Sequence, residues 1–387
     1  MLPQEIRNII IQNRHQTPQE VALKLNGKGY NLQLIVQQIE GWQKAKEKLP
    51  TWHKNDEILF PIRLSVEQCS SEITAAYKAQ IIKGGNLVDI TGGFGVDSYY
   101  LSKNSENTTY VEQNNALFDI VKYNFEIFQL SNIKCLNRNG LDFVFENSIR
   151  YDAIFIDPAR RDNDGKKVFQ LADCEPNIIE NIDLLFTKSD KILVKTAPLL
   201  DIDKTIKDLK FVKEVHIVSV DNECKEVLYL LENEWVEEEK IITVNISKNQ
   251  NQHFSFLFSD ERKIEPTYSQ PLKYLYEPNA SILKSGAFKS IAQYYNLKKV
   301  AQHTHFYTST DLLETFPGRK FEILFEGNEK EILKKLNGNM ANVIVRNYPL
   351  SAEALRKKMR IKDGGDLYVV GFQLFDAKNA ILLAQRM

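Results

Sequence analysis

Apolar residues recur every three to four positions along the first 48 residues, a spacing typical of amphipathic helices. Thr17-Pro18 supports this interpretation, because threonine caps a helix and proline fits its first turn. The pattern therefore predicts helices up to residue 48, a loop near residues 49–52 and a further helix over residues 65–82. The apolar positions behind the prediction are Ile6, Ile9, Ile10, Val21, Leu23, Leu25, Leu32, Leu34, Ile35 and Ile39.

The middle of the chain alternates short apolar runs with amphipathic stretches that begin near Val96, Asn115 and Pro176. Such alternation predicts an α/β fold with a mostly parallel sheet and helices on both faces. The last two runs are separated by residues 221–226 alone, so we expect them to form an antiparallel hairpin at the edge of the sheet. The predicted strands are residues 86–90, 108–112, 133–136, 153–157, 191–195, 215–220 and 227–231.

This alternation stops at an acidic segment, residues 234–240, where we place a domain boundary. An α+β pattern follows. The sequence thus predicts a helical region over residues 1–78, an α/β domain over residues 79–236 and an α+β domain over residues 237–387. The expected strands of the last domain are residues 241–246, 254–258, 321–325, 341–346, 367–375 and 380–384, and its expected helices are residues 281–295, 329–336 and 351–360.

Composition limits the class of protein. The chain has 387 residues, of which 43% are hydrophobic and 26% charged, as in globular proteins of two or three domains. The sequence contains no run of about 18 apolar residues, which is the length needed to cross a membrane. Its first residues lack the pattern of a signal peptide. The four cysteines form no CxxC pair, which predicts reduced thiols, a cytoplasmic location and no metal site.

The net charge of -1 hides a difference between the parts of the chain. Residues 241–387 carry 21 Lys and Arg against 14 Asp and Glu, whereas residues 79–240 carry 19 against 29. A basic last third beside an acidic middle fits a phosphate-binding domain attached to a catalytic domain. Charge differences of this size also arise without any function, so both interpretations stay open.

The most informative segment is LVDITGGFGVD, in which a predicted strand ends at Asp89 and a helix follows the loop. Gly92, Gly93 and Gly95 let the loop backbone approach a ligand, with the start of the helix directed at it. The loop is not GxGxxG, which disfavours a dinucleotide. A single glycine loop is otherwise weak support, since tight turns also use glycine.

Acidic residues follow the next three predicted strands. Glu112 ends the second strand, Asp142 lies in the turn after the third, and Asp157 ends the fourth. Open parallel sheets bind ligands at the carboxyl ends of their strands, where an acid suits ribose hydroxyls. Together these residues predict a nucleotide-like ligand.

The segments LVDITGGFGVD, YVEQN, NGLDF and FIDPARR resemble class I S-adenosylmethionine-dependent methyltransferases over residues 65–232. SSEITAAYKAQ, VKTAPLLD, ECKEVL, YEPNASILKSGAF and RNYPLSAEALRKKMRIKDGGD resemble, more narrowly, bacterial methyltransferases with a C-terminal THUMP-like domain. The resemblance implies an α/β fold with a Rossmann-like methyltransferase sheet and a C-terminal α+β THUMP-like domain. It also implies S-adenosylmethionine as the cofactor and structured RNA, such as tRNA or rRNA, as the substrate. It places Asp89 and the loop glycines at the methionine end, Glu112 at the ribose, Asp142 at the adenine and Asp157 at the transferred methyl group.

Asp157 and Lys195 end neighbouring strands of that fold, so we expect their side chains to meet and to be catalytic. With Lys78 and Glu226 they resemble the Lys-Asp-Lys-Glu tetrad of 2′-O-ribose methyltransferases, where a lysine can deprotonate a hydroxyl. Lys78 lies only 11 residues before Asp89, a shorter link than that family uses. The alternative is a structural Lys195–Asp157 pair.

Other residues offer weaker chemistry. Arg160, beside Arg161, could bind a substrate phosphate or could pair with acids in its own loop. Cys174 could be a nucleophile, although a cysteine of this kind is more often a buried apolar residue. His303 and His305 could share a face of a strand, but no further ligand lies near in sequence, so we expect no metal there.

Arg356, Lys357 and Lys358 crowd a predicted helix of the last domain. Such a helix suits an RNA backbone, although charged runs more often face solvent without a partner. The leading hypothesis is therefore an S-adenosylmethionine-dependent methyltransferase acting on RNA. The rivals are the same chemistry on a protein or small molecule, and an inactive RNA-binding protein with this fold.

Overall fold

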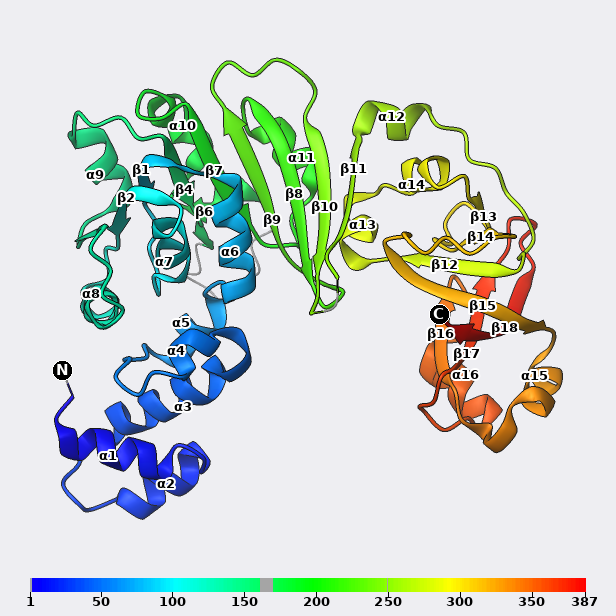
Figure 1. Ribbon diagram of the computed structural model, residues 1–387, viewed down its shortest axis with the longest axis horizontal. Coiled ribbons are helices and arrows are strands. Elements are labelled where there is room, and N and C mark those ends of the chain that lie inside the picture. The colour runs from blue at the N-terminus through cyan, green and yellow to red at the C-terminus, as the bar shows by residue number, and fades with distance from the viewer. Residues whose placement is uncertain (1, 161–169, 249) are drawn as a thin grey trace. The chain divides into compact units, whose positions relative to one another are not determined.

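The computed structural model describes residues 2–160, 170–248 and 250–387, without the side chains of residues 160 and 337 (Figure 1). The chain forms two compact units. The first runs to Glu214 and includes Glu226–Glu237, and the second consists of Val215–Lys225 and Glu238–Met387. Within the described residues, no helix is long and apolar enough to cross a membrane.

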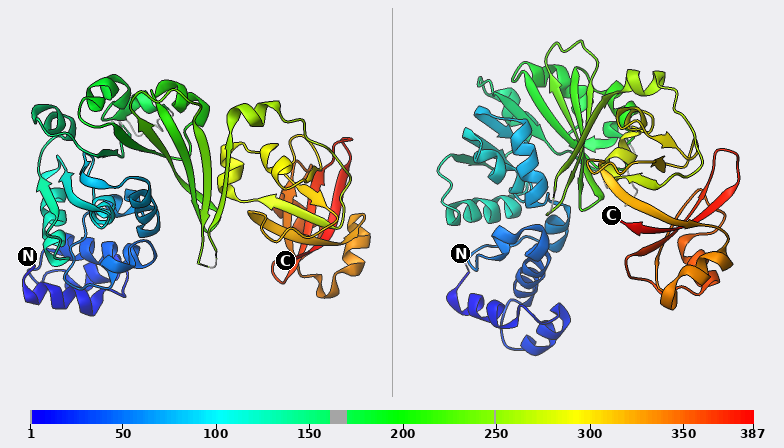
Figure 2. Two further views of the ribbon diagram at one scale, coloured as in Figure 1. Left: turned by 45° about the horizontal axis from the view of Figure 1, so that its top comes forward. Right: turned by 45° about the vertical axis from the view of Figure 1, so that its right-hand side comes forward.

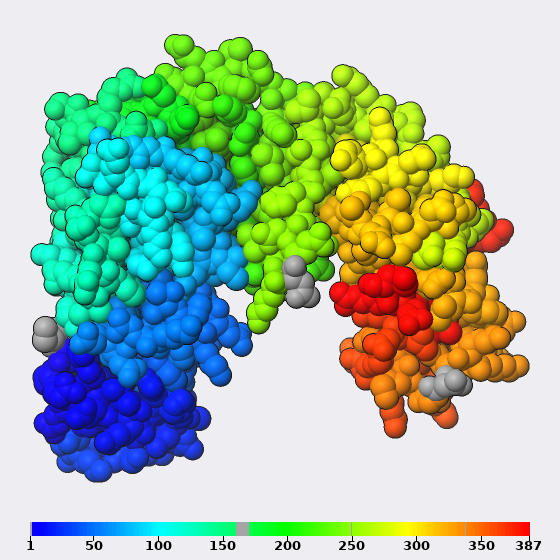
Figure 3. Space-filling model, in the orientation of Figure 1, coloured from blue at the N-terminus to red at the C-terminus, as the bar shows by residue number. Residues whose placement is uncertain are grey.

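The first unit begins with helices, as the sequence predicts, and they form a continuous blue surface in Figure 3. Thr17 caps the second helix through a capping box with Glu20. Two expectations were wrong. The predicted loop at residues 49–52 is a short helix, and the predicted helix over residues 65–82 is two helices, because Ser71 caps a new one. The bounds are α1 (Gln4–Asn13), α2 (Pro18–Leu25), α3 (Leu32–Lys48), α4 (Pro50–His53), α5 (Arg63–Gln68) and α6 (Glu72–Ile81).

Strands and helices then alternate through the rest of this unit. The unit boundary falls within the last two strands. The elements are β1 (Gly84–Asp89), α7 (Val96–Ser102), β2 (Ser105–Val111), α8 (Asn115–Ile127), β3 (Ile133–Leu136), α9 (Gly140–Glu146), β4 (Ala153–Ile156), β5 (Ala159–Arg160), the 3-10 helix η1 (Leu171–Asp173), β6 (Cys174–Glu175), α10 (Ile178–Phe186), β7 (Lys191–Thr196), α11 (Ile202–Asp208), β8 (Val212–Val220) and β9 (Glu223–Glu232).

The sheet of the first unit has the strand order β9-β7-β4-β1-β2-β3. Its neighbours are parallel except β9, which is antiparallel to β7. The mostly parallel sheet predicted from the sequence is confirmed. The chain builds from β1 to β2 and β3 on one side, and then returns to add β4 and β7 on the other. This reversal creates a switch point at the carboxyl ends of β1 and β4, where open α/β sheets bind ligands.

An aromatic cluster packs the N-terminal helices against the switch point. Trp52 of α4 is 1% exposed, and its ring centroid lies 4.8 Å from that of Tyr99 and 5.0 Å from that of Phe128. Phe94, in the loop after β1, belongs to the same cluster. Burying such side chains stabilises the fold by about 2–3 kcal/mol each. The helical region is therefore part of the support of the loop.

In the second unit, β10 lies between β8 and β11. The hairpin of β8 and β9 is therefore not at an edge, which corrects the expectation from the sequence. The physical reason is that β10 covers the open edge of β8, where unpaired backbone groups would otherwise remain. Asp221 N, for example, donates to Ile246 O at 2.9 Å. These strands are β10 (Lys240–Ile246) and β11 (Gln252–Leu257).

A seven-stranded sheet of order β13-β14-β12-β15-β18-β17-β16 forms the rest of the second unit (Figure 2). Its neighbours are antiparallel except β16 and β17. The helix predicted over residues 281–295 is two helices, because Gly286 adopts a left-handed φ of +79° that ends the first. The elements are α12 (Phe258–Lys263), β12 (Tyr274–Pro278), α13 (Ala280–Ser285), α14 (Ser290–Tyr294), β13 (Lys298–Lys299), β14 (Tyr307–Ser309), β15 (Gly318–Glu326), α15 (Glu329–Lys335), the 3-10 helix η2 (Asn337–Asn339), β16 (Asn342–Arg346), α16 (Ala352–Met359), β17 (Leu367–Gln373) and β18 (Asn379–Arg386).

Candidate functional site

The glycine loop after β1 is tied to two neighbouring strand ends. Gly93 N donates a hydrogen bond to Glu112 Oε2 at 2.9 Å, and Asp157 N donates to Thr91 Oγ1 at 2.7 Å. The loop therefore joins the ends of β1, β2 and β4. This is the clustering of strand ends that the sequence predicted at the switch point.

Glycine is required in this loop for two reasons. A Cβ atom at Gly92 would lie 2.2 Å from the ring of Tyr110, so only glycine lets the loop cross that strand. Gly95 has a φ of +74°, and a Cβ atom there would lie 2.6 Å from Val121. A larger residue at either position would displace the loop from the strand ends.

Asp89 ends β1 and is completely buried. Ser98 Oγ donates to Asp89 Oδ2 at 2.6 Å, and Thr91 N donates to Asp89 Oδ1 at 3.0 Å. Its carboxyl group thus holds the loop to the start of α7. Burial raises the pKa of Asp89 from its ordinary value of 3.8 to about 7, and the nearby Asp97 adds to the rise.

The raised pKa of Asp89 predicts a pH dependence of stability. The folded protein keeps a proton on Asp89 that the unfolded chain releases above about pH 4, so this group lowers the free energy of unfolding as pH rises from about 4 to 7. We expect Asp89→Asn to remove this contribution. Urea unfolding at several pH values measures it, with the exposed Asp119→Asn as a control that keeps the wild-type slope. Equal slopes in the wild type and Asp89→Asn would contradict the assignment.

Glu112 and Asp142 stand beside the loop. Glu112 Oε1 accepts a hydrogen bond from Asn114 N at 2.7 Å, so both of its oxygens are oriented. Asp142 is exposed in the first turn of α9, and Asn139 caps this helix. A Cβ atom at Gly140 would lie 2.0 Å from Ile90 O, which shows how closely α9 approaches the end of β1.

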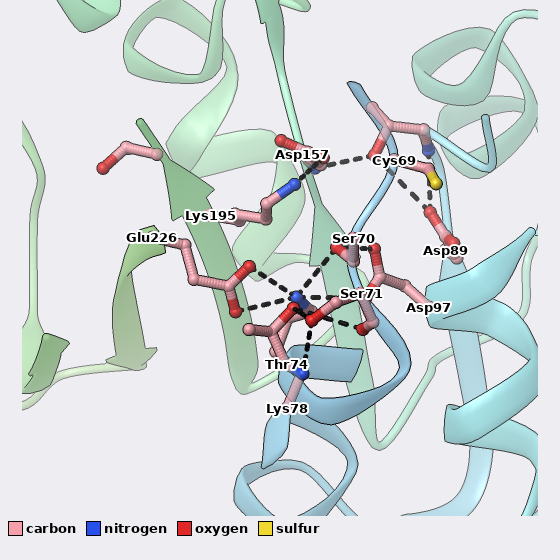
Figure 4. Close-up of polar contacts among 12 residues, drawn as sticks. Cys69, Ser70, Ser71, Thr74, Lys78, Asp89, Asp97, Asp157, Lys195 and Glu226 are labelled. Carbon is pink, nitrogen blue, oxygen red and sulfur yellow. Dashed lines mark hydrogen bonds and ion pairs between the residues drawn. The ribbon is translucent and has the colours of Figure 1, made fainter. Parts of the chain in front are cut away.

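Asp157 and Lys195 meet, as expected from the sequence. The parallel register pairs Ile156 of β4 with Val194 of β7, so the next residue of each strand emerges at the same edge. Lys195 Nζ donates to Asp157 Oδ2, as Figure 4 shows. The Asp157 side chain is 32% exposed and that of Lys195 12% exposed. The pair therefore lies at the rim of the switch point.

The charge state of Lys195 follows from its neighbours. Burial acts to lower the pKa of Lys195, but Asp157, Asp97 and Glu226 together raise it above its ordinary value. Lys195 is therefore an ammonium ion at neutral pH, and in this state it donates hydrogen bonds and cannot accept a proton. Asp157 is the acceptor of the pair.

A second, buried network surrounds Lys78 of α6, which is 0% exposed (Figure 4). Lys78 Nζ donates to both oxygens of Glu226 at 2.8 Å and to Ser70 Oγ at 3.0 Å. It also forms an ion pair with Asp97 Oδ1 at 3.1 Å. The four residues that resembled a Lys-Asp-Lys-Glu tetrad thus form two ion pairs, Lys78 with Glu226 and Lys195 with Asp157.

Sequence reasoning missed Ser70 and Asp97. Ser70 Oγ donates to Asp97 Oδ2 at 2.7 Å, which links the entry to α6 with the start of α7. Asp97 could have been found from the sequence, because it is an acid in the first turn of the helix that follows a glycine loop. Ser70 carried no such signal, because a serine before a helix is usually only a cap.

The remaining candidates have simpler surroundings. The side chain of Arg160 and the whole of Arg161 lie outside the described residues. Cys174 is 5% exposed in β6, which fits the buried apolar alternative. His305 stacks on Phe288 with ring centroids 3.6 Å apart. Among the described residues, no group of three or more His, Cys, Asp or Glu side chains is arranged to hold a metal ion.

The basic residues of α16 are partly neutralised in the second unit. Lys358 Nζ lies 2.7 Å from Glu329 Oε1, and Arg356 Nη1 lies 3.4 Å from Asp363 Oδ1. Lys357 is exposed. These acidic partners weaken the attraction of the helix for an anion, because they already neutralise part of its positive charge.

Comparison with family models matches two parts of the second unit. Residues 274–317 match a ferredoxin-like domain and residues 318–386 match a THUMP domain-like model. Two curated relatives also match parts of the chain. A Mycoplasma mobile protein named an uncharacterized RNA methyltransferase is 26% identical over 149 residues, which is 37% of this chain and 40% of that protein. An uncharacterized S-adenosylmethionine-dependent methyltransferase of Mycobacterium tuberculosis is 22% identical over 225 residues, 56% of this chain and 59% of that protein.

Among solved structures, that of a candidate methyltransferase from Porphyromonas gingivalis W83 is 30% identical. The match covers 100% of both chains with a TM-score of 0.86. The likeness therefore includes both units and the helical region, whereas the match to the curated relatives spans only about half of their length.

Proposed function

The chain belongs to the family of class I methyltransferases that carry a C-terminal THUMP-like domain, and we propose that it transfers a methyl group from S-adenosylmethionine to RNA. The observation that carries the proposal is the joined set of strand ends at the switch point, where the loop after β1 bonds to Glu112 and Asp157. The names of the relatives support both the cofactor and the RNA substrate. The reaction then belongs in the cytoplasm, with tRNA or rRNA as the substrate.

The side chains at the switch point suit this cofactor. Glu112, Asp142 and Asp157 are carboxylates, which would repel the phosphates of a dinucleotide but accept hydrogen bonds from ribose hydroxyls and an adenine amino group. They also favour a ligand with a positive sulfonium. We assign Glu112 to the ribose, Asp142 to the adenine, and Asp89 with Gly92, Gly93 and Gly95 to the support of the methionine end. When bound, S-adenosylmethionine supplies an electrophilic methyl group.

The cofactor assignment predicts a loss of affinity in one variant. Because Glu112 would accept hydrogen bonds from both ribose hydroxyls, Glu112→Ala is expected to weaken S-adenosylmethionine binding by about 1.5–3 kcal/mol. Isothermal titration calorimetry measures the change. Glu106→Ala, an exposed position nearer the amino end of the same strand β2, is the control and keeps wild-type affinity. Unchanged binding in a folded Glu112→Ala variant would remove Glu112 from the site.

Asp157 and Lys195 are the proposed catalytic residues. Lys195 is charged and holds Asp157 at the rim, so Asp157 can accept a proton or hydrogen bond from the substrate atom that takes the methyl group. The ammonium of Lys195 would in turn donate to a substrate oxygen. Lys78 and Glu226 lie deeper and are buried, so they position this pair rather than touch the substrate.

Methylation assays with two RNA pools test the function. Total RNA from cells that lack this protein is incubated with the purified full chain and tritiated S-adenosylmethionine. The RNA is expected to gain label, while RNA from wild-type cells, already methylated, gains little. Mass spectrometry of nucleosides from both pools should show a methylated nucleoside that is present in RNA from wild-type cells and missing from RNA of the cells that lack this protein. Label found only in protein would support the rival substrate, and no binding of S-adenosylmethionine would support the inactive RNA-binding rival.

A further inference from the structure

A buried carboxylate in the second unit is held between two arginines. The side chain of Glu277 in β12 is only 3% exposed. Arg319 of β15, its cross-strand partner in the register, donates from Nε to Glu277 Oε2 at 2.7 Å. Arg346, at the end of β16, donates from Nη2 to Glu277 Oε1. Glu277 thus fixes two guanidinium groups from strands that are not neighbours in the sheet.

Both arginines keep donors available. Arg346 uses Nη1 and Nη2 for Val345 O and Glu277, and Arg319 uses Nε and Nη2 for Glu277. In the part of the chain that the structure describes, Arg346 Nε and Arg319 Nη1 donate to no other group. The two side chains are 42% and 29% exposed, so these donors can be reached from solvent. A guanidinium has five N–H donors in a rigid fork, and such a fork matches phosphate oxygens.

Lys299 adds a positive charge near His305, which is itself neutral near pH 7. Lys299 is 2% exposed, and its ammonium lies 5.7 Å from the centroid of the Phe288 ring, on which His305 stacks. Nδ1 of His305 is buried and finds no partner among the described residues. Burial first, and then Lys299, His303 and Arg346, lower the pKa of His305 to about 4. Lys299 and Arg346 therefore both lie near His305, and the carboxylate of Glu277 faces two guanidinium groups, which leaves one positive charge in excess.

We propose that Arg319 and Arg346, held by Glu277 beside Lys299 and His305, bind a backbone phosphate of the RNA substrate. The inference rests on the proposed function, which it deepens by placing an RNA contact on arginines of β15 and β16 rather than on the basic residues of α16. Two guanidinium groups share one carboxylate, so the remaining positive charge would attract the phosphate, and the buried carboxylate orients both guanidinium groups before binding. Binding then costs less conformational entropy than it would if the cationic side chains had to be fixed on binding.

The test compares neutral replacements of two ion pairs. The variant Glu277→Gln with Arg346→Gln removes one fork without leaving its partner carboxylate unpaired. The control, Lys273→Gln with Glu322→Gln, removes an exposed pair on the same sheet, whose atoms lie 3.7 Å apart. Fluorescence anisotropy measures the binding of labelled RNA from the deletion strain to each full-length chain over a range of salt concentrations. We expect the first variant to bind about tenfold more weakly than the wild type, with a salt slope reduced by about 0.7, as for one lost phosphate contact on a single strand. The control should match the wild type.

The outcomes separate the site from the function. Equal affinity and salt slope in the wild type and the first variant would overturn the site, and methylation of RNA would still stand. Absence of RNA binding by the wild type would count against the proposed function itself. A second measurement does not depend on a variant: the ring resonances of His305 in the wild-type chain should shift when RNA is added. Inorganic phosphate alone should shift them less, because a free ion lacks the other RNA contacts. Resonances that stay unchanged with bound RNA would overturn the inference.

Discussion

Replacing Lys195 by methionine is expected to lower methyl transfer at least about a hundredfold while S-adenosylmethionine affinity stays within about twofold of the wild type. The variant keeps most of the side-chain volume but removes the ammonium that holds Asp157. An interaction that matters mainly in the transition state lowers turnover without weakening ground-state binding. Single-turnover rates with the RNA from the deletion strain measure the first quantity, and calorimetry measures the second.

The matched control is Lys191→Met at the opposite, exposed end of the same strand β7, which should keep wild-type turnover. If the Lys195–Asp157 pair is only structural, Lys195→Met would keep its activity and lose stability instead. That loss would be about 1 kcal/mol, because the Asp157 side chain is one-third exposed and water would partly solvate it. Retained turnover together with such a loss would remove Lys195 from the catalytic residues.

The position of Lys195 was predictable because it depends on strand ends alone. Asp157 and Lys195 each follow a short apolar run, and a parallel register places the residues after two neighbouring strands side by side. The same logic applied to the glycine loop and Glu112. Its cause is geometric, since one edge of a parallel sheet collects whatever follows its strands.

Contacts between distant segments were harder to derive. Lys78 and Glu226 are 148 residues apart, and their meeting depends on α6 lying beside the first half of β9. A resemblance grouped them, but hydrophobic periodicity carries no information about such a pairing. The network around Glu277 was invisible for the same reason, because β12 itself was missed and β16 is not its neighbour in the sheet.

Errors in the secondary structure came from local turn chemistry. The apolar pattern of residues 281–295 continues across Gly286, although its left-handed conformation ends α13 there. The prediction of a hairpin at the sheet edge was wrong for another reason. The apolar pattern of a strand indicates its length and its buried face, but it does not indicate which strands lie beside it, and here β10 pairs with β8.

Replacing Lys78 by methionine is expected to lower the free energy of unfolding of the first unit by about 3–5 kcal/mol. Lys78 is fully buried, and its loss would leave the carboxylates of Glu226 and Asp97 without their common cation. Urea unfolding followed by tryptophan fluorescence reports on this unit, since all three tryptophans, Trp42, Trp52 and Trp235, lie within it.

A second variant separates the loss of the pair from a general packing defect. In Lys78→Met with Glu226→Leu the Glu226 carboxylate is removed as well, and only Asp97 stays without its cation. Part of the lost stability should therefore return, with a coupling energy of at least about 1 kcal/mol in a double-mutant cycle. Lys204→Met, which breaks an exposed pair with Asp208 at 3.0 Å, is the control and should cost less than about 0.5 kcal/mol. A double variant as unstable as Lys78→Met would contradict the electrostatic explanation, because the cost would then come from the altered shape of α6 rather than from unpaired buried carboxylates. With recovery, methyl transfer by the stable double variant becomes informative. Reduced turnover there, at wild-type cofactor affinity, would show that the buried pair also positions Lys195 at the rim.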